Sequence, residues 1–364
     1  MKKILFTTLI LSIFLTANIF TQETVFNTTP VVKEAVYHDK TLPLRNMKII
    51  LPGERDRSWK DNIIQNEERD EREMYRNFIQ PEADLVQQTE MGTRSVTGPI
   101  YNFDGVGRLT PLSPPDTDGD VGPNHYFQMI NLSFAIYDKQ GNKLYGPVDN
   151  STLWNGFPGP WSGTNDGDPI ILYDEMADRW MASQFAIYTS NNKYYELVAV
   201  SETGDPLGAW YRYAFEFDLF PDYPKLSVWP DGYYATFHMF SGNYAGMGVA
   251  VFEREKMLNG DPDAEMIYFG EYGSKFGFLP SDVDGDPPPA GTPNYITGIN
   301  FWGNKQMEIW ELSADWANPA NSTFTLAESL TPATFNSNVS GIPQPGTGTG
   351  LASISSVLMF RLPF

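Results

Sequence analysis

The sequence predicts an all-β fold built from a repeated unit and preceded by a charged arm. Three observations support this prediction: an acidic Gly turn returns along the chain, a strand that opens on an aromatic residue follows each turn, and short apolar runs alternate with turn residues. The chain has 364 residues, of which 41% are hydrophobic and 14% aromatic, so it can bury a sizeable core.

The clearest copy of the unit spans residues 166–185, DGDPIILYDEMADRWMASQF, and further copies begin at 115, 222 and 281. The aromatic residues that open the strands are spaced by 54, 53 and 62 residues: Tyr126, Trp180, Tyr233 and Tyr295. A period of roughly 50 residues with about four short strands is typical of a β-propeller blade. The alternative, a β-sandwich, does not predict an acidic turn at a constant phase.

At this period, residues 98–364 hold about five blades, with a weak fifth unit at 350–362. A strand that ends near Phe364 would leave the last sheet with an unpaired edge. We therefore expect a propeller that is incomplete at its C-terminus, unless the ring closes by another route. A helical turn is expected at residues 253–258.

Residues 1–22 read as a signal peptide, with Lys2 and Lys3 before an apolar run at 4–15. This run is shorter than the ~20 residues of a spanning helix, so cleavage is favoured over a membrane anchor. We expect a secreted, periplasmic or cell-surface protein without membrane insertion once the signal is removed. Residues 23–97 form a charged arm or linker, and the mixed-charge part at 53–80 is expected to be partly helical or a solvated linker.

The net charge is −20, and cysteine is absent. An acidic surface repels nucleic acid and anionic membranes and favours cations or neutral partners such as glycans. Without cysteine, neither a disulfide nor thiol chemistry is available to this chain.

The repeat region resembles secreted bacterial β-propellers of the broad sialidase-like and five-bladed glycosidase-like type. It is most similar to uncharacterised exported propeller proteins that carry PPDTDGDVGPNHY followed by DPIILYDEMADRW, here at 114–126 and 168–180. The resemblance covers about residues 101–362. It implies a propeller architecture and no particular reaction. Arginine is scarce in the repeats, which disfavours a sialidase, and Arg179 is expected to pair with Asp174 or Asp178 at a strand edge.

The acidic turns are the strongest candidates for a metal site. Equivalent phase in a propeller would bring them towards one place near the axis, and clustered carboxylates without cysteine suit Ca²⁺. The expected ligands are Asp116, Asp118, Asp120, Asp166, Asp168, Asp282, Asp284 and Asp286. The alternative is turn chemistry, in which aspartate side chains bond to the local backbone.

Two further sites follow from residue chemistry. Paired carboxylates are the groups that a glycosidase needs, and Asp116, Asp168 and Asp222 are the candidates. The Pro-Gly loop at 154–163 carries Trp154, Phe157 and Trp161, which could stack on sugar rings if exposed or pack in the core if buried. The sequence favours a calcium-stabilised binding module for an extracellular glycan or protein; the alternative is a glycoside hydrolase with axial carboxylates.

Overall fold

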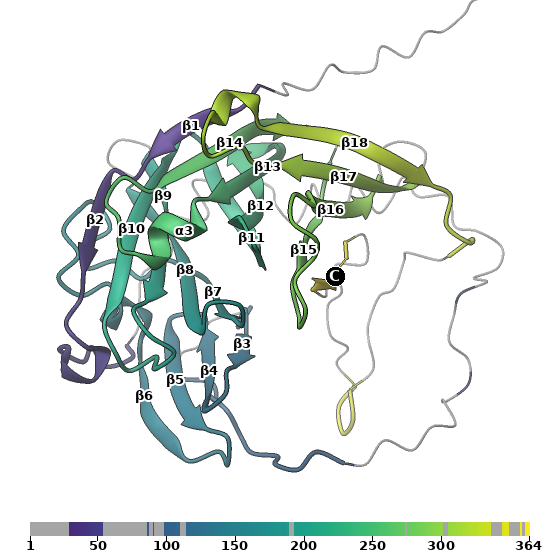
Figure 1. The fold of residues 1–364 in the computed structure, drawn as a ribbon. Helices are drawn as coiled ribbons and strands as arrows, with labels where there is room; N and C mark the ends of the chain where they lie inside the picture. The colour runs from purple at the N-terminus through teal and green to yellow at the C-terminus, as the bar shows by residue number, and fades with distance from the viewer. Residues whose placement is uncertain are drawn as a thin grey trace, which may run out of the picture.

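The computed structural model shows a chain built almost entirely of β-strands, as the sequence predicts (Figure 1). It describes residues 29–53, 86, 90, 98–109, 114–188, 193–273, 275–300, 305–335, 344–348, 357–358 and 361–364. Within these ranges the strands form four sheets that follow one another along the chain, and the successive strands of each sheet pair antiparallel.

The first sheet contains β3 (Asp118–Val121), β4 (His125–Ile130), β5 (Ser133–Asp138) and β6 (Lys143–Asp149). The second contains β7 (Gly167–Asp174), β8 (Arg179–Tyr188), β9 (Lys193–Ser201) and β10 (Trp210–Phe217). The third contains β11 (Phe220–Trp229), β12 (Gly232–Ser241), β13 (Asn243–Phe252) and β14 (Glu265–Tyr272). The fourth contains β15 (Leu279–Asp282), β16 (Asn294–Ile299), β17 (Met307–Ser313) and β18 (Thr323–Leu330).

Three short helical segments join these strands. They are η2 (Asn150–Thr152), α3 (Arg254–Leu258) and η3 (Pro319–Asn321). The α3 segment confirms the predicted helical turn at 253–258. It begins directly after β13 and leads into the last strand of the third sheet.

Each sheet corresponds to one predicted repeat. The four aromatic residues that mark the repeats all occupy the second position of the second strand of their sheet: Tyr126, Trp180, Tyr233 and Tyr295. Trp180 and Tyr233 are fully buried. The period read from the sequence is therefore the period of the sheets.

The sheets are arranged as blades around a common axis, with the first strand of each sheet innermost (Figure 1). Aspartates link neighbouring inner strands: the Ile171 N–H donates to Asp118 Oδ2 at 2.8 Å, and the Val228 N–H donates to Asp282 Oδ1 at 2.7 Å. Large aromatic side chains fill the space between blades. The number of about five blades and the closure of the ring stay predictions, because most of the fifth unit lies outside the described residues.

The N-terminal arm contributes strands to two blades. β1 (Val31–Glu34) pairs antiparallel with β14, β2 (Tyr37–Lys40) pairs antiparallel with β10, and η1 (Leu44–Asn46) follows. Each extended segment satisfies backbone groups that an edge strand would otherwise leave unpaired. The start of the arm is thus part of the blades, where a separate segment was expected. The predicted helical stretch at 53–80 stays a prediction, because all of it after residue 53 lies outside the described residues.

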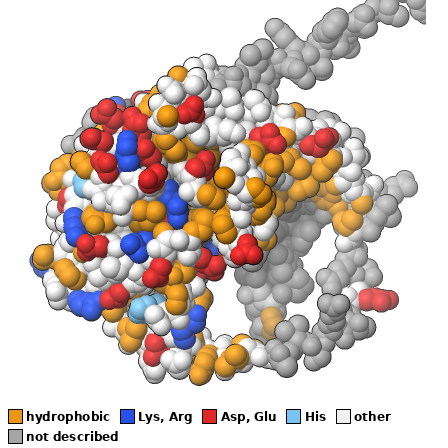
Figure 2. Space-filling view, in the orientation of Figure 1, with side chains coloured by type: hydrophobic (Ala, Val, Ile, Leu, Met, Phe, Trp, Pro, Cys, Tyr) orange, Lys and Arg blue, Asp and Glu red, His pale blue; other side chains and the backbone are white. Residues whose placement is uncertain are grey.

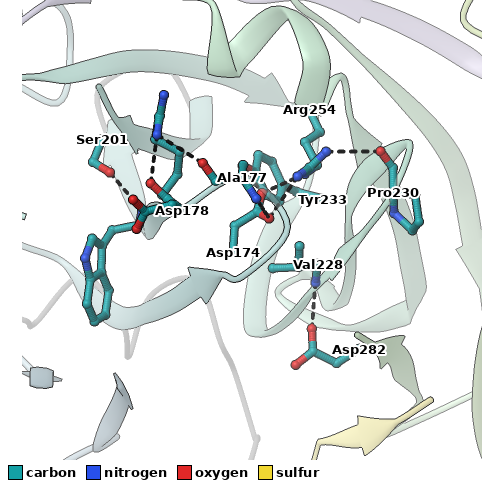
Figure 3. Close-up of polar contacts among 11 residues, drawn as sticks. Asp174, Ala177, Asp178, Ser201, Val228, Pro230, Tyr233, Arg254 and Asp282 are labelled. Carbon is teal, nitrogen blue, oxygen red and sulfur yellow. Dashed lines mark hydrogen bonds and ion pairs between the residues drawn. The ribbon is translucent and has the colours of Figure 1, made fainter. Parts of the chain in front are cut away.

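A buried ion pair joins the second and third blades (Figure 3). Arg254 donates to both carboxylate oxygens of Asp174, at 2.6 and 2.8 Å, and the Tyr233 hydroxyl donates to the same carboxylate at 3.0 Å. Arg179, the expected partner of Asp174 or Asp178, instead donates to the backbone carbonyls of residues 177 and 178. Arg179 is the strand partner of Asp174 in the register of β7 and β8, as expected, but the Asp174 carboxylate bonds to Arg254 from the neighbouring blade.

The last described residues lie next to the inner strand of the fourth blade. β19 (Leu362–Pro363) pairs in parallel with β15, and the Phe364 N–H donates to the Asp282 carbonyl at 2.8 Å. The Phe364 ring meets Trp229 edge-on, with 5.2 Å between ring centroids. This segment therefore contacts the third blade as well as the fourth.

Candidate functional site

A cavity of about 230 Å³ lies where the inner strands of the four blades approach the axis. Every inner strand contributes to its wall, at residues 116–118, 168–172, 223–226 and 279–282, and Arg361 adds to it. β3 and β7 run in the same direction, since Asp118 bonds to Ile171 and Asp120 bonds to Tyr173 further along both strands. The strand starts therefore lie at one end of the cavity, which we call the entry end.

One asparagine side chain connects two aspartates of neighbouring blades at the entry end. Asn131 links them, because its side-chain amide donates to Asp116 Oδ2 and its Oδ1 accepts from the Asp168 N–H at 2.9 Å. Both aspartates have positive φ, 38° at Asp116 and 47° at Asp168, as has Tyr223 at 51° on the third blade. Non-glycine residues seldom adopt this conformation, and they concentrate at functional sites.

Two other aspartates lie deeper and are bonded to the backbone. Burial raises the pKa of Asp118, although the Ile171 N–H opposes the shift. Burial likewise raises the pKa of Asp282 to about 6, against the opposing effects of the Val228 N–H and the Arg361 charge. These two carboxyl groups hold inner strands together and also face the cavity.

A lysine provides positive charge among these carboxylates. Lys225 Nζ donates to the Pro224 carbonyl at 3.1 Å and lies 3.6 Å from the centroid of the Tyr223 ring. Burial lowers the pKa of Lys225, while the charges of Asp168, Asp118 and other nearby aspartates oppose the shift. The acidic wall is thus partly neutralised by a side chain of the protein itself.

The Tyr223 ring is backed by a neutral histidine. His238 stacks on Tyr223 at 4.6 Å and on Phe276 at 3.9 Å, and its Nε2 accepts from the Gly277 N–H at 3.0 Å. Burial, with a contribution from the Lys225 charge, lowers the pKa of His238 to about 3. The imidazole is therefore uncharged near neutral pH and acts as a flat support for the cavity wall.

The eight aspartates predicted as calcium ligands do not share one environment. Four of them line the cavity: Asp116, Asp118, Asp168 and Asp282. Asp120 pairs with Arg361, Asp166 accepts from the backbone of β8, and Asp284 and Asp286 are exposed. Among the described residues, no group of three or more His, Asp or Glu side chains is arranged to hold a metal ion.

The three candidate catalytic residues lie near one another in the fold. Asp116 and Asp168 line the cavity, and Asp222 is buried directly before Tyr223, which lines it. Asp116 and Asp168 come from corresponding positions at the start of two neighbouring inner strands. The strand register thus aligns Asp168 with Asp116, whereas alignment of the Asp-Gly-Asp turns in the sequence would match Asp168 with Asp120.

The structure corrects the prediction that the aromatic loop at 154–163 binds a ligand. Trp154, Phe157 and Trp161 are at most 5% exposed and belong to the core between the first two blades. The Phe157 ring lies 5.1 Å from Tyr37 of the arm and 4.8 Å from the guanidinium of Arg212. The expected exposed platform is absent from this loop because distant segments cover it.

Four residues of the site were not predicted from the sequence: Asn131, Tyr223, Lys225 and Arg361. A signal for two of them exists in the repeat. Tyr223-Pro224-Lys225 corresponds to Asp168-Pro169-Ile170 in the second unit, so a lysine replaces an apolar strand residue. A charged residue at an apolar position of a repeat indicates a local role that the other copies do not share.

No family model and no curated protein matches this sequence. Distant similarity is found to solved glycosidases. An exo-β-1,3-galactanase from Phanerochaete chrysosporium with galactose has a TM-score of 0.32 at 7% identity, covering 59% of this chain and 60% of that one. A GH43_1 enzyme from Xanthomonas citri has 0.30 at 14%, covering 61% and 76%, and a GH43 β-1,3-galactosidase with galactodeoxynojirimycin has 0.28 at 9%, covering 59% and 90%. Similarity this low does not place the chain in their family.

No helix in the described part of the chain has the length and apolar character needed to cross a membrane. Acidic side chains are spread over the face seen in Figure 2, with basic ones among them. This distribution is consistent with the net charge of −20.

Proposed function

We propose that the protein is an exported glycoside hydrolase that cleaves a neutral glycan in the axial cavity, with Asp116 and Asp168 as its carboxylate pair. The observation that carries the proposal is that both aspartates line the cavity and that Asn131 bridges them, through the Asp116 carboxylate and the Asp168 backbone N–H. Glycoside hydrolysis needs one carboxyl group to protonate the leaving oxygen and a second to act as base or nucleophile.

The surroundings of the pair support a functional role for it. Asp116 and Asp168 both have positive φ, whereas a purely structural turn could use glycine there without this conformational cost. Lys225 lies in the same wall, and its positive charge reduces the repulsion between the carboxylates. These features favour a site that holds two carboxylates in a defined arrangement.

The size and charge of the cavity favour a small neutral ligand. Its volume of about 230 Å³ is below the roughly 300–1,000 Å³ of pockets for drug-sized molecules. Four aspartates line it against one lysine and one arginine, which disfavours an anionic ligand. A single neutral sugar ring fits both conditions.

The binding module that the sequence favoured is the second candidate. Asp118 and Asp282 accept hydrogen bonds from the backbone of neighbouring blades, so part of the acidic wall has a structural role. A module would bind glycan without releasing sugar. Calcium binding stays a prediction within either candidate: thermal unfolding that rises with Ca²⁺ and falls with EDTA would support it, and an unchanged transition would contradict it.

The test is a substrate panel. Chromogenic glycosides of neutral hexoses and pentoses, together with neutral galactan, arabinan and xylan, are incubated with the wild-type protein and with an Asp116→Asn/Asp168→Asn double variant. Release of sugar by the wild type alone supports the hydrolase. Binding of a glycan without release supports the module, and neither binding nor release contradicts both.

A further inference from the structure

Arg361 lines the cavity and pairs with Asp120, which lies further along the first inner strand than Asp116. Its Nη2 is 3.0 Å from Asp120 Oδ2 on β3, and its Nη1 is 3.3 Å from Asp282 Oδ2 on β15. One guanidinium therefore spans from the inner strand of the first blade to the inner strand of the fourth, across the axis.

The backbone around Arg361 fixes its position. Leu362 and Pro363 pair with β15, the Phe364 N–H bonds to the Asp282 carbonyl, and the Phe364 ring packs on Trp229. The segment 361–364 thus contacts the first, third and fourth blades at one end of the cavity.

We propose that Arg361 and β19 form the floor of the cavity, so that the site takes the terminal residue of a glycan chain and excludes its interior. This inference rests on the proposed function. A polymer bound through its middle needs an open groove or two openings, whereas a pocket with a floor has one opening. A cavity of about 230 Å³ closed at its far end has room for the last sugar and little more.

The charges explain why an arginine is suited to this position. Without a cation, the carboxylates of Asp120 and Asp282 would face each other across the axis and repel. A planar guanidinium offers several donors in fixed directions and can serve two carboxylates at once. We therefore expect removal of Arg361 to separate the first and fourth blades at this end and to open the floor.

The floor can be tested without any activity, because the chain has no cysteine. Leu172 lines the cavity, is buried, and precedes Tyr173, whose N–H bonds to the Arg361 partner Asp120, so Leu172→Cys introduces a single reporter thiol beside the floor. Its labelling is measured with a small methanethiosulfonate and with a bulky polyethylene glycol maleimide. We expect the bulky reagent to react slowly in this background and several-fold faster when Arg361→Ala is added.

Two controls and one replacement variant make the labelling decisive. Arg45→Ala removes an exposed arginine paired with Asp205 and should leave the rate unchanged. Ala186→Cys, a buried thiol between strands of the second blade, should stay protected in the Arg361→Ala background. If Arg361→Ala does not fold, Arg361→Gln replaces it. An unchanged bulky-reagent rate, or equal exposure of the Ala186→Cys thiol, would overturn the floor.

The substrate side of the inference has its own readout. With a neutral oligosaccharide ladder that the wild type hydrolyses, the first product should be monosaccharide. Early mid-length fragments would overturn the restriction to chain ends. If no substrate in the panel is hydrolysed, the proposed function fails, and the labelling result still decides whether Arg361 forms a floor.

Discussion

The Asp174–Arg254 pair shows how single residues hold neighbouring blades together. Asp174 is fully buried, and its carboxylate receives two hydrogen bonds from Arg254 and one from the Tyr233 hydroxyl (Figure 3). Removing one partner of such a pair leaves an uncompensated charge in the interior.

We therefore predict that Arg254→Met lowers the free energy of unfolding by about 3–5 kcal/mol, as measured by urea unfolding. Arg45→Ala is the matched control, because its partner Asp205 is exposed and surface pairs contribute about 0–1 kcal/mol. Equal losses in the two variants would contradict a structural role for the buried pair.

His238 predicts a specific dependence of stability on pH. Its pKa is about 3 in the folded protein and about 6.5 in the unfolded chain. Between these values the unfolded chain binds a proton that the folded protein does not, so this residue lowers stability as pH falls below 6.5. At pH 4 the loss is about 3 kcal/mol.

His238→Gln removes the titration and keeps an acceptor for the Gly277 N–H. The measurement is the difference in unfolding free energy between wild type and variant at pH 7 and at pH 4. We expect the variant to gain relative to the wild type as pH falls. A constant difference across this range would show that His238 accepts a proton in the folded protein.

At the scale of elements, the arm strands depend on one buried anchor. Arg212 donates to both carboxylate oxygens of Asp39, at 2.8 and 2.7 Å, and the Trp210 N–H donates to the Thr41 hydroxyl at 2.9 Å. Arg212 is 2% exposed, so its charge relies on the arm for a partner.

We predict that Asp39→Ala frees β2 from β10 and costs about 1.5–3 kcal/mol, the range for hydrogen bonds to charged groups. Hydrogen exchange of the β2 amides is the measurement, and they should lose protection before the blades do. Lys33→Ala serves as the control, since its partner Asp218 is exposed. Unchanged protection of β2 in Asp39→Ala would show that strand pairing alone holds the arm.

The elements also show what the sequence could predict. Tyr126, Trp180, Tyr233 and Tyr295 repeat because each begins the second strand of a blade, and a local rule of this kind is visible in one sequence. The arm strands pair with edges more than 170 residues away, so no local pattern marks them. The Phe157 ring likewise packs on Tyr37 and Arg212, which are distant in the chain.

At the scale of the whole molecule, the described blades bring residues of their inner strands together around the axial cavity. Each turn alone reads as local turn chemistry, and only the circular arrangement places Asp116 beside Asp168 with Lys225 in the same wall. The basic residues of the wall, Lys225 and Arg361, do not belong to the repeated pattern, so the repeat could not predict them.

The role of Asp116 and Asp168 as the carboxylate pair can be tested by comparing kcat/KM on the best substrate of the panel. The proteins compared are the wild type, Asp116→Asn, Asp168→Asn and Asp286→Asn. Asp286 belongs to an acidic turn of the same type but is exposed and outside the cavity wall. We predict a fall of about 10²–10⁴-fold for each of the first two variants, the usual contribution of a catalytic acid or base, and no marked change for Asp286→Asn. Retention of activity in Asp116→Asn and Asp168→Asn would contradict a catalytic role for these two aspartates.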